Sequence, residues 1–387
     1  MRDWFSLLPI ANQFPPLHGL RVLAIVSVLQ VHVTVVFVQN GLMVDAAYVP
    51  FATVSATICF GMDLFFVMSG FLIGSMLLRT LERPGKWLFL RFYLRRAARI
   101  FPLYYAILTV LTLLWASAQQ RHDVVWEYIF LTNYFPFKEP QVMGWAWSLC
   151  VEEHFYLTVP LILVLLHRLR SHRSRIALLV IVWLSALAIR LTMLHTRTWR
   201  IGWDDPKLFH DMYLPTHTRF DTLIAGIFLA YVQYNFKDEL RTFFSRRPTR
   251  LAFYFGSGVC FWILMQPKLL GLENLFLWNA LTWGTVSSLA YVLLLFPMLN
   301  SEGIAQRGLG SAFMYRLATL SYGIYLVHVP VCERIIIPIA RHLVALPMWI
   351  LWPASVLGLV GCATMVAYGL HLLVEKPFLR LRERFAQ

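Results

Sequence analysis

The sequence contains few charged residues. Only 14% of its 387 residues are Asp, Glu, Lys or Arg, against about 25% in ordinary soluble domains. Acidic residues are fewer than basic residues, with 20 Asp and Glu against 34 Lys and Arg. Hydrophobic residues make up 59% of the chain, more than a soluble domain can shield from water. The composition therefore excludes an ordinary soluble protein. It favours an all-α polytopic membrane protein whose apolar side chains face lipid.

Cysteine is also sparse, and its pattern excludes two kinds of site. The five cysteines are an odd number, widely spaced, and lie in or beside apolar segments. They fit neither a disulfide framework nor a metal-ligand spacing, so no metal is expected. The chain shows no tandem repeat, and we expect its first apolar segment to be a retained span rather than a cleavable signal. We expect a single transmembrane domain over residues 1–387, with its core near 15–380 and no appended soluble domain.

Apolar segments of about 20 residues, the length that spans a bilayer, recur along the chain. We expect about ten transmembrane helices, at residues 17–38, 51–78, 100–118, 148–166, 176–194, 217–235, 251–265, 277–299, 317–339 and 348–374. Lys and Arg favour alternate loops by about three to one, which places both termini in the cytoplasm. Arg190 is counted with the outer loops. The clustering accounts for the net charge of +14 and makes membrane lipid, not nucleic acid, the expected partner.

Polar residues within these segments are the main functional lead, because a charge inside a bilayer usually faces a cavity or a partner. Arg21 and His32 project from nearly the same face of the first segment, roughly 16 Å apart along its axis. Histidine titrates near neutrality, so His32 can act as a general base. A structural hydrogen bond to a neighbouring helix is the alternative role. The spans are expected to enclose a polar cavity that holds these side chains.

The second apolar segment contains Asp63 within the stretch from Gly61 to Leu72. Its carboxylate could orient and charge-stabilise the imidazole of His32. The alternative role is to cap the helix. Ser69 is expected to make a hydrogen bond between helices, and Gly70 allows another helix or a ligand to approach closely.

Two further clusters lie at opposite faces of the expected membrane. Arg96 and Arg99 share one helix face at the cytoplasmic side and, with Arg95, could clamp phosphates. Simple anchoring of the helix is the alternative. Glu152 and Glu153, at the outer side, could bind an acceptor hydroxyl or pair with a basic residue. Polar residues that are each expected to be structural when taken alone are Arg219, Asp221, Tyr322, Tyr325, His328 and Glu375.

Together these motifs resemble acyltransferase family 3, the bacterial integral-membrane O-acyltransferases of surface polysaccharides. The elements that carry the resemblance are Leu20-Arg21 to His32, Gly61 to Leu72, Arg96 and Arg99 with Pro102 and Tyr104, Trp147 to Tyr156, Ser321 to His328, and Glu375 with Pro377. They follow in the family's order over most of the chain. His18 and His154 depart from the family pattern, and neither departure changes Arg21, His32 or Asp63 themselves.

The resemblance implies an O-acyltransferase for groups other than aminoacyl groups, located in the bacterial cytoplasmic (inner) membrane. The implied donor is acetyl-CoA or another cytoplasmic acyl-CoA. The implied acceptor is a sugar hydroxyl of a surface or exported glycan, such as lipopolysaccharide O-antigen or an exopolysaccharide, free or linked to lipid. His32 would either deprotonate this hydroxyl or itself take the acyl group. The site residues implied are Arg21, His32 and Asp63 for catalysis, Arg95, Arg96 and Arg99 for CoA, and Trp147, Glu152, Glu153, Tyr156 and His328 for the acceptor.

Two other functions stay open from the sequence. A transporter or flippase without chemistry would also carry intramembrane charges, although no inverted repeat or pair of broken helices is visible. An enzyme with the same chemistry could instead acylate a small cytoplasmic molecule such as a macrolide sugar.

Overall fold

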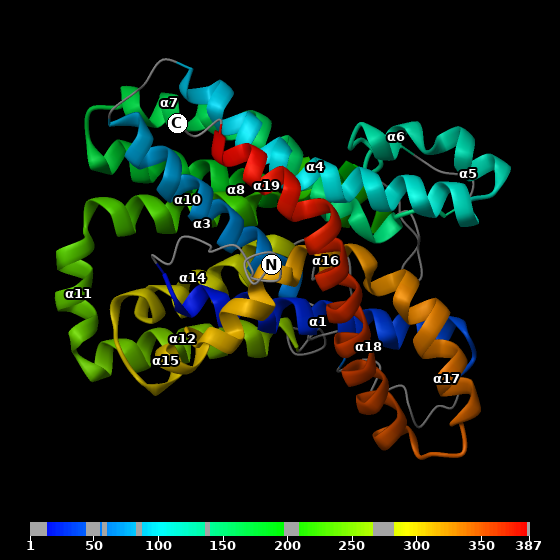
Figure 1. Ribbon diagram of the computed structural model, residues 1–387. Helices are drawn as coiled ribbons and strands as arrows, with labels where there is room; N and C mark the ends of the chain where they lie inside the picture. The colour runs from blue at the N-terminus through cyan, green and yellow to red at the C-terminus, as the bar shows by residue number, and fades with distance from the viewer. Residues whose placement is uncertain are drawn as a thin grey trace. The chain divides into compact units, whose positions relative to one another are not determined.

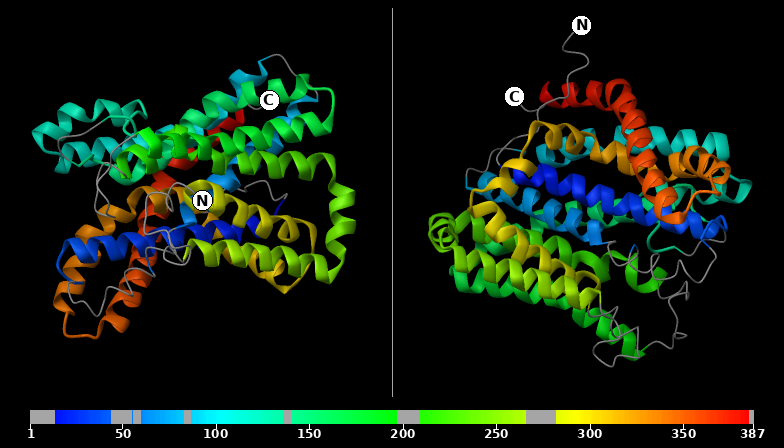
Figure 2. Two further views of the ribbon diagram at one scale, coloured as in Figure 1. Left: turned by 180° about the vertical axis from the view of Figure 1, so that it is seen from behind. Right: turned by 90° about the horizontal axis from the view of Figure 1, so that it is seen from below.

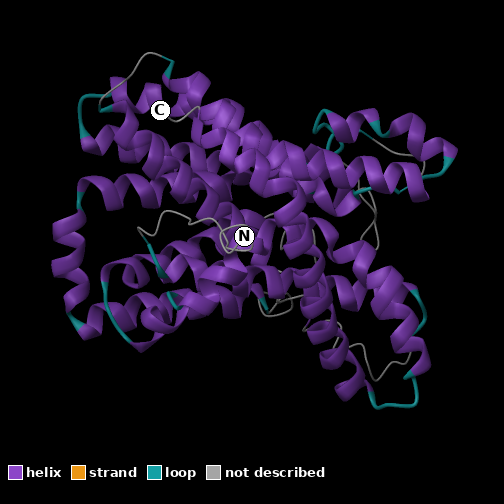
Figure 3. Cartoon of the chain, viewed as in Figure 1, coloured by secondary structure: helices purple, strands orange, loops and turns teal. Residues whose placement is uncertain are grey.

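The computed structural model describes residues 14–43, 55, 60–82, 87–135, 140–196, 209–265 and 282–384. Throughout these ranges every regular element is a helix and no strand occurs (Figure 3). Among the described residues, eight helical segments are long and apolar enough to cross a membrane. The predicted all-α polytopic class is therefore confirmed.

Each of the ten predicted spans overlaps a helix, and two of these helices are not apolar enough to count among the eight. One is α10 (Thr216–Asn235), whose first turns carry Arg219 and Asp221. The other is α12 (Arg247–Leu264), which begins with basic residues. The first parts of the predicted spans 51–78 and 277–299 lie largely outside the described residues.

The chain forms two compact units. The terminal unit comprises Met1–Met62, Leu90–Leu114 and Gly303–Gln387, and the central unit comprises Asp63–Phe89 and Trp115–Glu302. Helices of the terminal unit are α1 (Pro16–Gln39), most of α4 (Leu88–Trp115), α15 (Ile304–Leu309), α16 (Ala312–Val331), η7 (Cys332–Ile336), α17 (Ile337–His342), α18 (Met348–Leu370), η8 (His371–Glu375) and α19 (Lys376–Arg384). Helices of the central unit are nearly all of α3 (Gly61–Leu81), α5 (Ala118–Asp123), α6 (Val125–Tyr128), η4 (Gly144–Ala146), α7 (Trp147–Arg168), α8 (His172–Thr196), η5 (Phe209–Tyr213), α10, α11 (Lys237–Ser245), α12, η6 (Thr282–Val286) and α14 (Ser287–Asn300).

In the terminal unit, α1 packs against α16 and α18. The ring of His18 meets that of Tyr315 edge to face, with centroids 5.2 Å apart. Further along α1, the indole N–H of Trp352 donates to the hydroxyl of Thr34 at 2.9 Å. α16 continues through α17, and α18 returns alongside it as a helical hairpin (Figure 1). The first helix is thus fixed at several levels along its length by the C-terminal helices.

In the central unit, α3 and α10 cross at backbone distance. A Cβ on Gly70 would overlap the carbonyl of Leu223, and a Cβ on Gly226 would overlap the carbonyl of Val67. The predicted close approach at Gly70 is confirmed, and the approaching partner is a helix. α10 also packs on α8, and α12 packs on α14. α11 runs from the end of α10 to the start of α12 (Figures 1 and 2).

Candidate active site

Two histidines meet in the terminal unit. The rings of His32 on α1 and His328 on α16 lie edge to face, with centroids 4.6 Å apart and an interplanar angle of 80°. His328 is fully buried and His32 is half-buried. The histidines of the first and fifth predicted motifs therefore form one local pair, and neither is an exposed side chain.

The hydrogen bonds of these rings fix which nitrogen can react. Nδ1 of His32 lies 2.9 Å from the carbonyl of Val28, and Nδ1 of His328 lies 2.5 Å from the carbonyl of Tyr325. A carbonyl oxygen only accepts, so each Nδ1 carries the hydrogen and donates it. In the neutral imidazole the lone pair is then on Nε2. Nε2 is thus the atom of each ring that could accept a proton.

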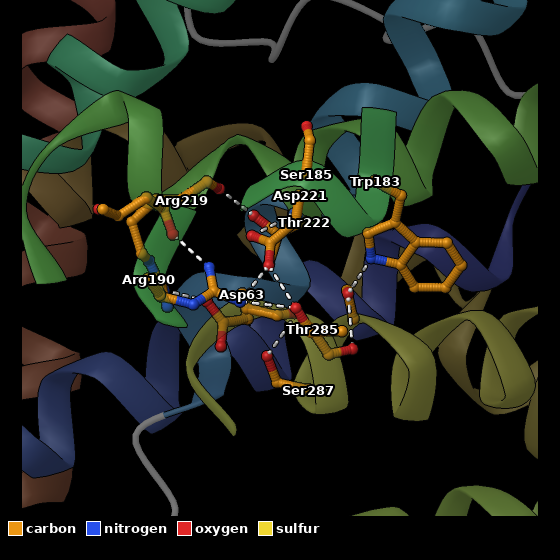
Figure 4. Close-up of polar contacts among 12 residues, drawn as sticks. Asp63, Trp183, Ser185, Arg190, Arg219, Asp221, Thr222, Thr285 and Ser287 are labelled. Atoms are coloured by element: carbon orange, nitrogen blue, oxygen red, sulfur yellow. Dashed lines mark hydrogen bonds and ion pairs between the residues drawn. The ribbon is translucent and has the colours of Figure 1, made fainter. Parts of the chain in front are cut away.

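Asp63 has a different partner from the one the sequence suggested. In the central unit its carboxylate forms a buried salt bridge with the guanidinium of Arg219 on α10 (Figure 4). The guanidinium also lies 4.6 Å from the ring centroid of Tyr213, in cation–π contact. The Val28 carbonyl, within α1, holds the tautomer of His32. The orienting role of Asp63 toward His32 therefore stays a prediction.

A second buried ion pair lies beside the first (Figure 4). Arg190 on α8 donates to Asp221 on α10 at 2.8 Å, and both side chains are fully buried. Arg190 also donates to Thr285 Oγ1 at 2.6 Å and to the carbonyl of Thr218. Thr285 in turn donates to the Asp221 carboxylate at 2.9 Å. The two arginines and two aspartates balance in charge, which is the condition for burying ions.

Counting Arg190 with the outer loops was wrong. The residue lies inside the predicted span 176–194, and its guanidinium is enclosed between α8 and α10. An unmatched arginine in a span is the signal that could have identified it, because a buried cation requires an anion. Gly284 completes the enclosure, since its φ of +91° suits glycine and a Cβ there would overlap the Asp221 carboxylate.

The predicted donor-binding arginines differ in exposure. Arg95 is exposed, whereas Arg96 and Arg99 are half-buried on the face of α4 that turns inward. Directly after them, the carbonyl of Ile100 accepts a hydrogen bond from the hydroxyl of Tyr322 at 2.9 Å. This contact joins α4 to α16, the helix that carries His328. The structure therefore gathers these two arginines and the histidine pair in the terminal unit.

The predicted acceptor motif at the start of α7 is partly engaged in packing. Tyr156 and Ser69 share a hydrogen bond of 2.9 Å, which confirms the interhelical role predicted for Ser69. Trp147 is buried and meets Phe66 edge to face, with centroids 6.1 Å apart. Glu152 and Glu153 are half-buried on the same helix.

One carboxylate that the sequence did not suggest fixes the chain before α7. Glu127 in α6 is buried, and its two oxygens accept the backbone N–H groups of Val142 and Met143, each at 2.8 Å. Burial raises the pKa of Glu127 to about 7, against the opposing effect of these two hydrogen bonds. Within the described ranges, no group of three or more His, Cys, Asp or Glu side chains could hold a metal ion.

The fold is that of a polytopic helical membrane protein, and two histidines meet between helices of its terminal unit. The family described as acyltransferase domain matches residues 15–369. The chain therefore belongs to acyltransferase family 3, a family of acyltransferase enzymes, which confirms the resemblance seen in the motifs.

The curated relatives include proteins of Staphylococcus aureus. The O-acetyltransferase OatA of strain NCTC 8325 is 29% identical over 234 residues, which cover 56% of this chain and 34% of the relative. A protein of strain COL with a provisional O-acetyltransferase name is 30% identical over 239 residues, 58% of this chain and 35% of that protein. The matched region thus spans about a third of each relative. No solved structure matches this chain.

Proposed function

We propose that this protein is an integral-membrane O-acyltransferase of the bacterial cytoplasmic membrane. It transfers an acyl group, in the first instance acetyl, from cytoplasmic acyl-CoA to a sugar hydroxyl of a surface or exported glycan. Family membership and the O-acetyltransferase names of the relatives support the class of reaction. The observation that carries the proposal is the histidine pair, in which His32 is held by the Val28 carbonyl with the lone pair on Nε2.

The chemistry assigned to His32 balances without another reagent. Nε2 takes the proton of the acceptor hydroxyl while the oxygen attacks the thioester carbon, the carbon–sulfur bond breaks, and CoA leaves as the thiolate. The alternative order uses the same atom as the nucleophile, so that an acyl-imidazole forms first and the acceptor then displaces it. The neighbouring ring of His328 sits 4.6 Å away between centroids, close enough to affect the proton affinity of His32.

Donor binding is assigned to the cationic end of the terminal unit. Arg96 and Arg99 are half-buried, so their guanidinium groups are less hydrated than that of exposed Arg95. Guanidinium groups bind phosphate bidentately, and CoA carries several phosphates. Arg21, half-buried between the start of α1 and His32, is assigned to the thioester end of the donor.

Acceptor binding is assigned to the start of α7 in the central unit. Glu152 and Glu153 supply carboxylate oxygens that accept sugar hydroxyls, and Trp147 supplies an aromatic ring. Tyr156, already bonded to Ser69, would act through the placement of α7.

The test uses purified full-length protein in lipid nanodiscs with acetyl-CoA and glycan fragments. We expect release of CoA thiol coupled to a mass increase of one acetyl group on the glycan. His32→Ala should lower this rate by about 10²–10⁴-fold, the usual contribution of a general base. The matched control is His195→Ala, which removes an exposed histidine at the end of α8 and should leave the rate unchanged.

Two outcomes would contradict the proposal. Wild-type protein that releases no CoA would argue for a transporter, and a His32→Ala variant with the rate of wild type would remove the central assignment. A single turnover with acetyl-CoA in the absence of acceptor separates the two chemical orders, because only the nucleophilic order then releases a burst of one CoA thiol per protein.

A further inference from the structure

A second buried histidine in the terminal unit has no role in the function proposed above. His371, at the end of α18, bonds through Nδ1 to Oε2 of Glu375 at 2.8 Å. The side chains are 1% and 5% exposed, respectively. A carboxylate and an imidazole four residues apart on one helix form a dyad in which the carboxylate fixes the tautomer of the ring. We refer to these two residues as the His371–Glu375 dyad.

The other ring nitrogen of the dyad is unsatisfied. Nε2 of His371 is buried and has no hydrogen-bond partner among the described residues. A buried polar atom without a partner destabilises the fold, because it has lost its hydrogen bonds to water. The dyad also spans a turn of π-helix, a geometry that is frequent at functional sites. Both observations indicate a position that a bound group completes.

Helix packing links the helix that carries this nitrogen to α4 through α16. Ala367, one turn before His371 on the same face of α18, packs against Gly323 of α16, where a Cβ would lie 3.1 Å from that of Ala367. The preceding residue of α16, Tyr322, donates a hydrogen bond to the carbonyl of Ile100 on α4. α4 and α18 therefore flank α16 at one level, and Arg99 adjoins that level on α4.

The same level lies away from the reactive histidines. His328 is five residues beyond Gly323 along α16, and His371 is four residues beyond Ala367 along the oppositely directed α18. At 1.5 Å per residue, the dyad and the histidine pair are roughly 14 Å apart along the helix axes. An extended pantetheine arm spans a distance of this order between its phosphate end and its sulfur.

We propose that the His371–Glu375 dyad is part of the donor site and that Nε2–H of His371 donates to a phosphate oxygen of acyl-CoA. The ring is then an imidazolium, with Glu375 as its counter-ion and the phosphate as the second hydrogen-bond partner. A phosphate offers only acceptor oxygens, so it complements the protonated ring and the guanidinium of Arg99 alike. This inference rests on the proposed function, because it locates the phosphate end of that reaction's donor.

The first experiment compares two donors in nanodiscs. S-acetyl-CoA carries the phosphates, and S-acetyl-pantetheine has the same thioester and arm without them. His371→Ala should raise KM for S-acetyl-CoA about tenfold with a smaller change in kcat, and should leave kcat/KM for S-acetyl-pantetheine unchanged. The matched control is His342→Ala, which removes an exposed histidine of the same unit at the end of α17.

A structural role would give another result. If His371→Ala lowers kcat/KM equally for both donors, or leaves KM for S-acetyl-CoA at its wild-type value, the dyad does not bind phosphate. Should the Ala variant fold poorly, His371→Gln serves in its place. It keeps a side-chain N–H donor without the positive charge, so a smaller rise of KM is expected, and an unchanged KM overturns the proposal.

A second measurement separates this proposal from the proposed function. Isothermal titration calorimetry measures the binding of CoA to the protein in nanodiscs. This binding requires no turnover. Binding that weakens about tenfold in His371→Ala supports the dyad even if wild-type protein transfers no acyl group, in which case the proposed function alone fails. Wild-type protein that binds no CoA overturns the dyad's role. If His371→Ala retains transfer activity and normal CoA binding, the dyad's role is also overturned, while the proposed function stands.

Discussion

Buried polar groups are handled differently in the two units. In the central unit, buried arginines and aspartates neutralise one another: Arg219 pairs with Asp63, and Arg190 pairs with Asp221. In the terminal unit, the Nδ1 atoms of His32 and His328 bond to carbonyls of their own helices, which leaves the tautomers fixed and the Nε2 lone pairs available. A charge that balances another charge is committed to the fold, whereas an imidazole oriented by its own backbone has its tautomer fixed without a counter-ion.

The two units also differ in how sensitive their helix packing is to mutation. The paired charges join α3, α8, α10 and η6, helices that cross closely through glycine positions. A mutation there leaves an uncompensated ion in an apolar interior. The histidines join α1 and α16 through a ring contact, whose loss removes packing area without exposing a charge. The predictions below test this distinction between stability in one unit and reactivity in the other.

The largest effect is expected from breaking the ion pair between α8 and α10. Arg190→Ala should lower the free energy of unfolding by about 3–5 kcal/mol, because Asp221 would stay buried without its cation. Size-exclusion chromatography and thermal unfolding in detergent measure this loss of folded protein. The double variant Arg190→Met with Asp221→Leu should recover much of the loss. A single variant as stable as wild type would show that the pair does not anchor the central unit.

The next effect concerns a buried carboxylate that bonds to amides. The pKa of Glu127 is raised to about 7 in the fold, so the folded state holds its proton where the unfolded state has released it. Stability should therefore be full below the unfolded value of 4.5 and fall as pH rises through about 7, by about 2–3 kcal/mol. Unfolding temperatures measured between these limits should decline for wild type and stay level for Glu127→Gln. Equal slopes would contradict the raised pKa.

A smaller effect on activity is expected in the terminal unit. His328→Gln should lower kcat about tenfold, because the ring beside His32 and its influence on proton transfer are lost. The unfolding temperature should change little, since no ion is left unpaired. The control is His342→Ala, an exposed position of the same unit. A fall in stability comparable with that of Arg190→Ala would erase the difference between the units.

The smallest effect sharpens the account of the central unit. Trp183 donates from its indole to the hydroxyl of Ser288 at 3.0 Å, beside the ion pairs (Figure 4). Trp183→Phe should lower the free energy of unfolding by about 1 kcal/mol, the usual net value of one hydrogen bond. Chemical denaturation in mixed detergent micelles measures it. A loss as large as that from Arg190→Ala would mean that neutral contacts, not charges, dominate the stability of this region.

Local composition determined the class of the protein and the positions of its helices. Runs of apolar residues predict spans because lipid accepts only segments that satisfy their own backbone hydrogen bonds. Ten predicted spans each overlap a helix, and Ser69 and Gly70 act between helices as expected. The motifs also identified the family, since order and spacing along the chain are properties of the sequence alone.

The partners of the polar side chains were decided by the tertiary structure. Asp63 and Arg219 are 156 residues apart in the chain, and nothing local to either indicates the other. Arg190 was assigned to an outer loop because of its charge, although it lies inside a predicted span. Likewise, the contact between His32 and His328 exists because α1 packs on α16. Hydrophobicity acts on each segment separately, whereas ion pairs and ring contacts depend on which helices pack together and at what level.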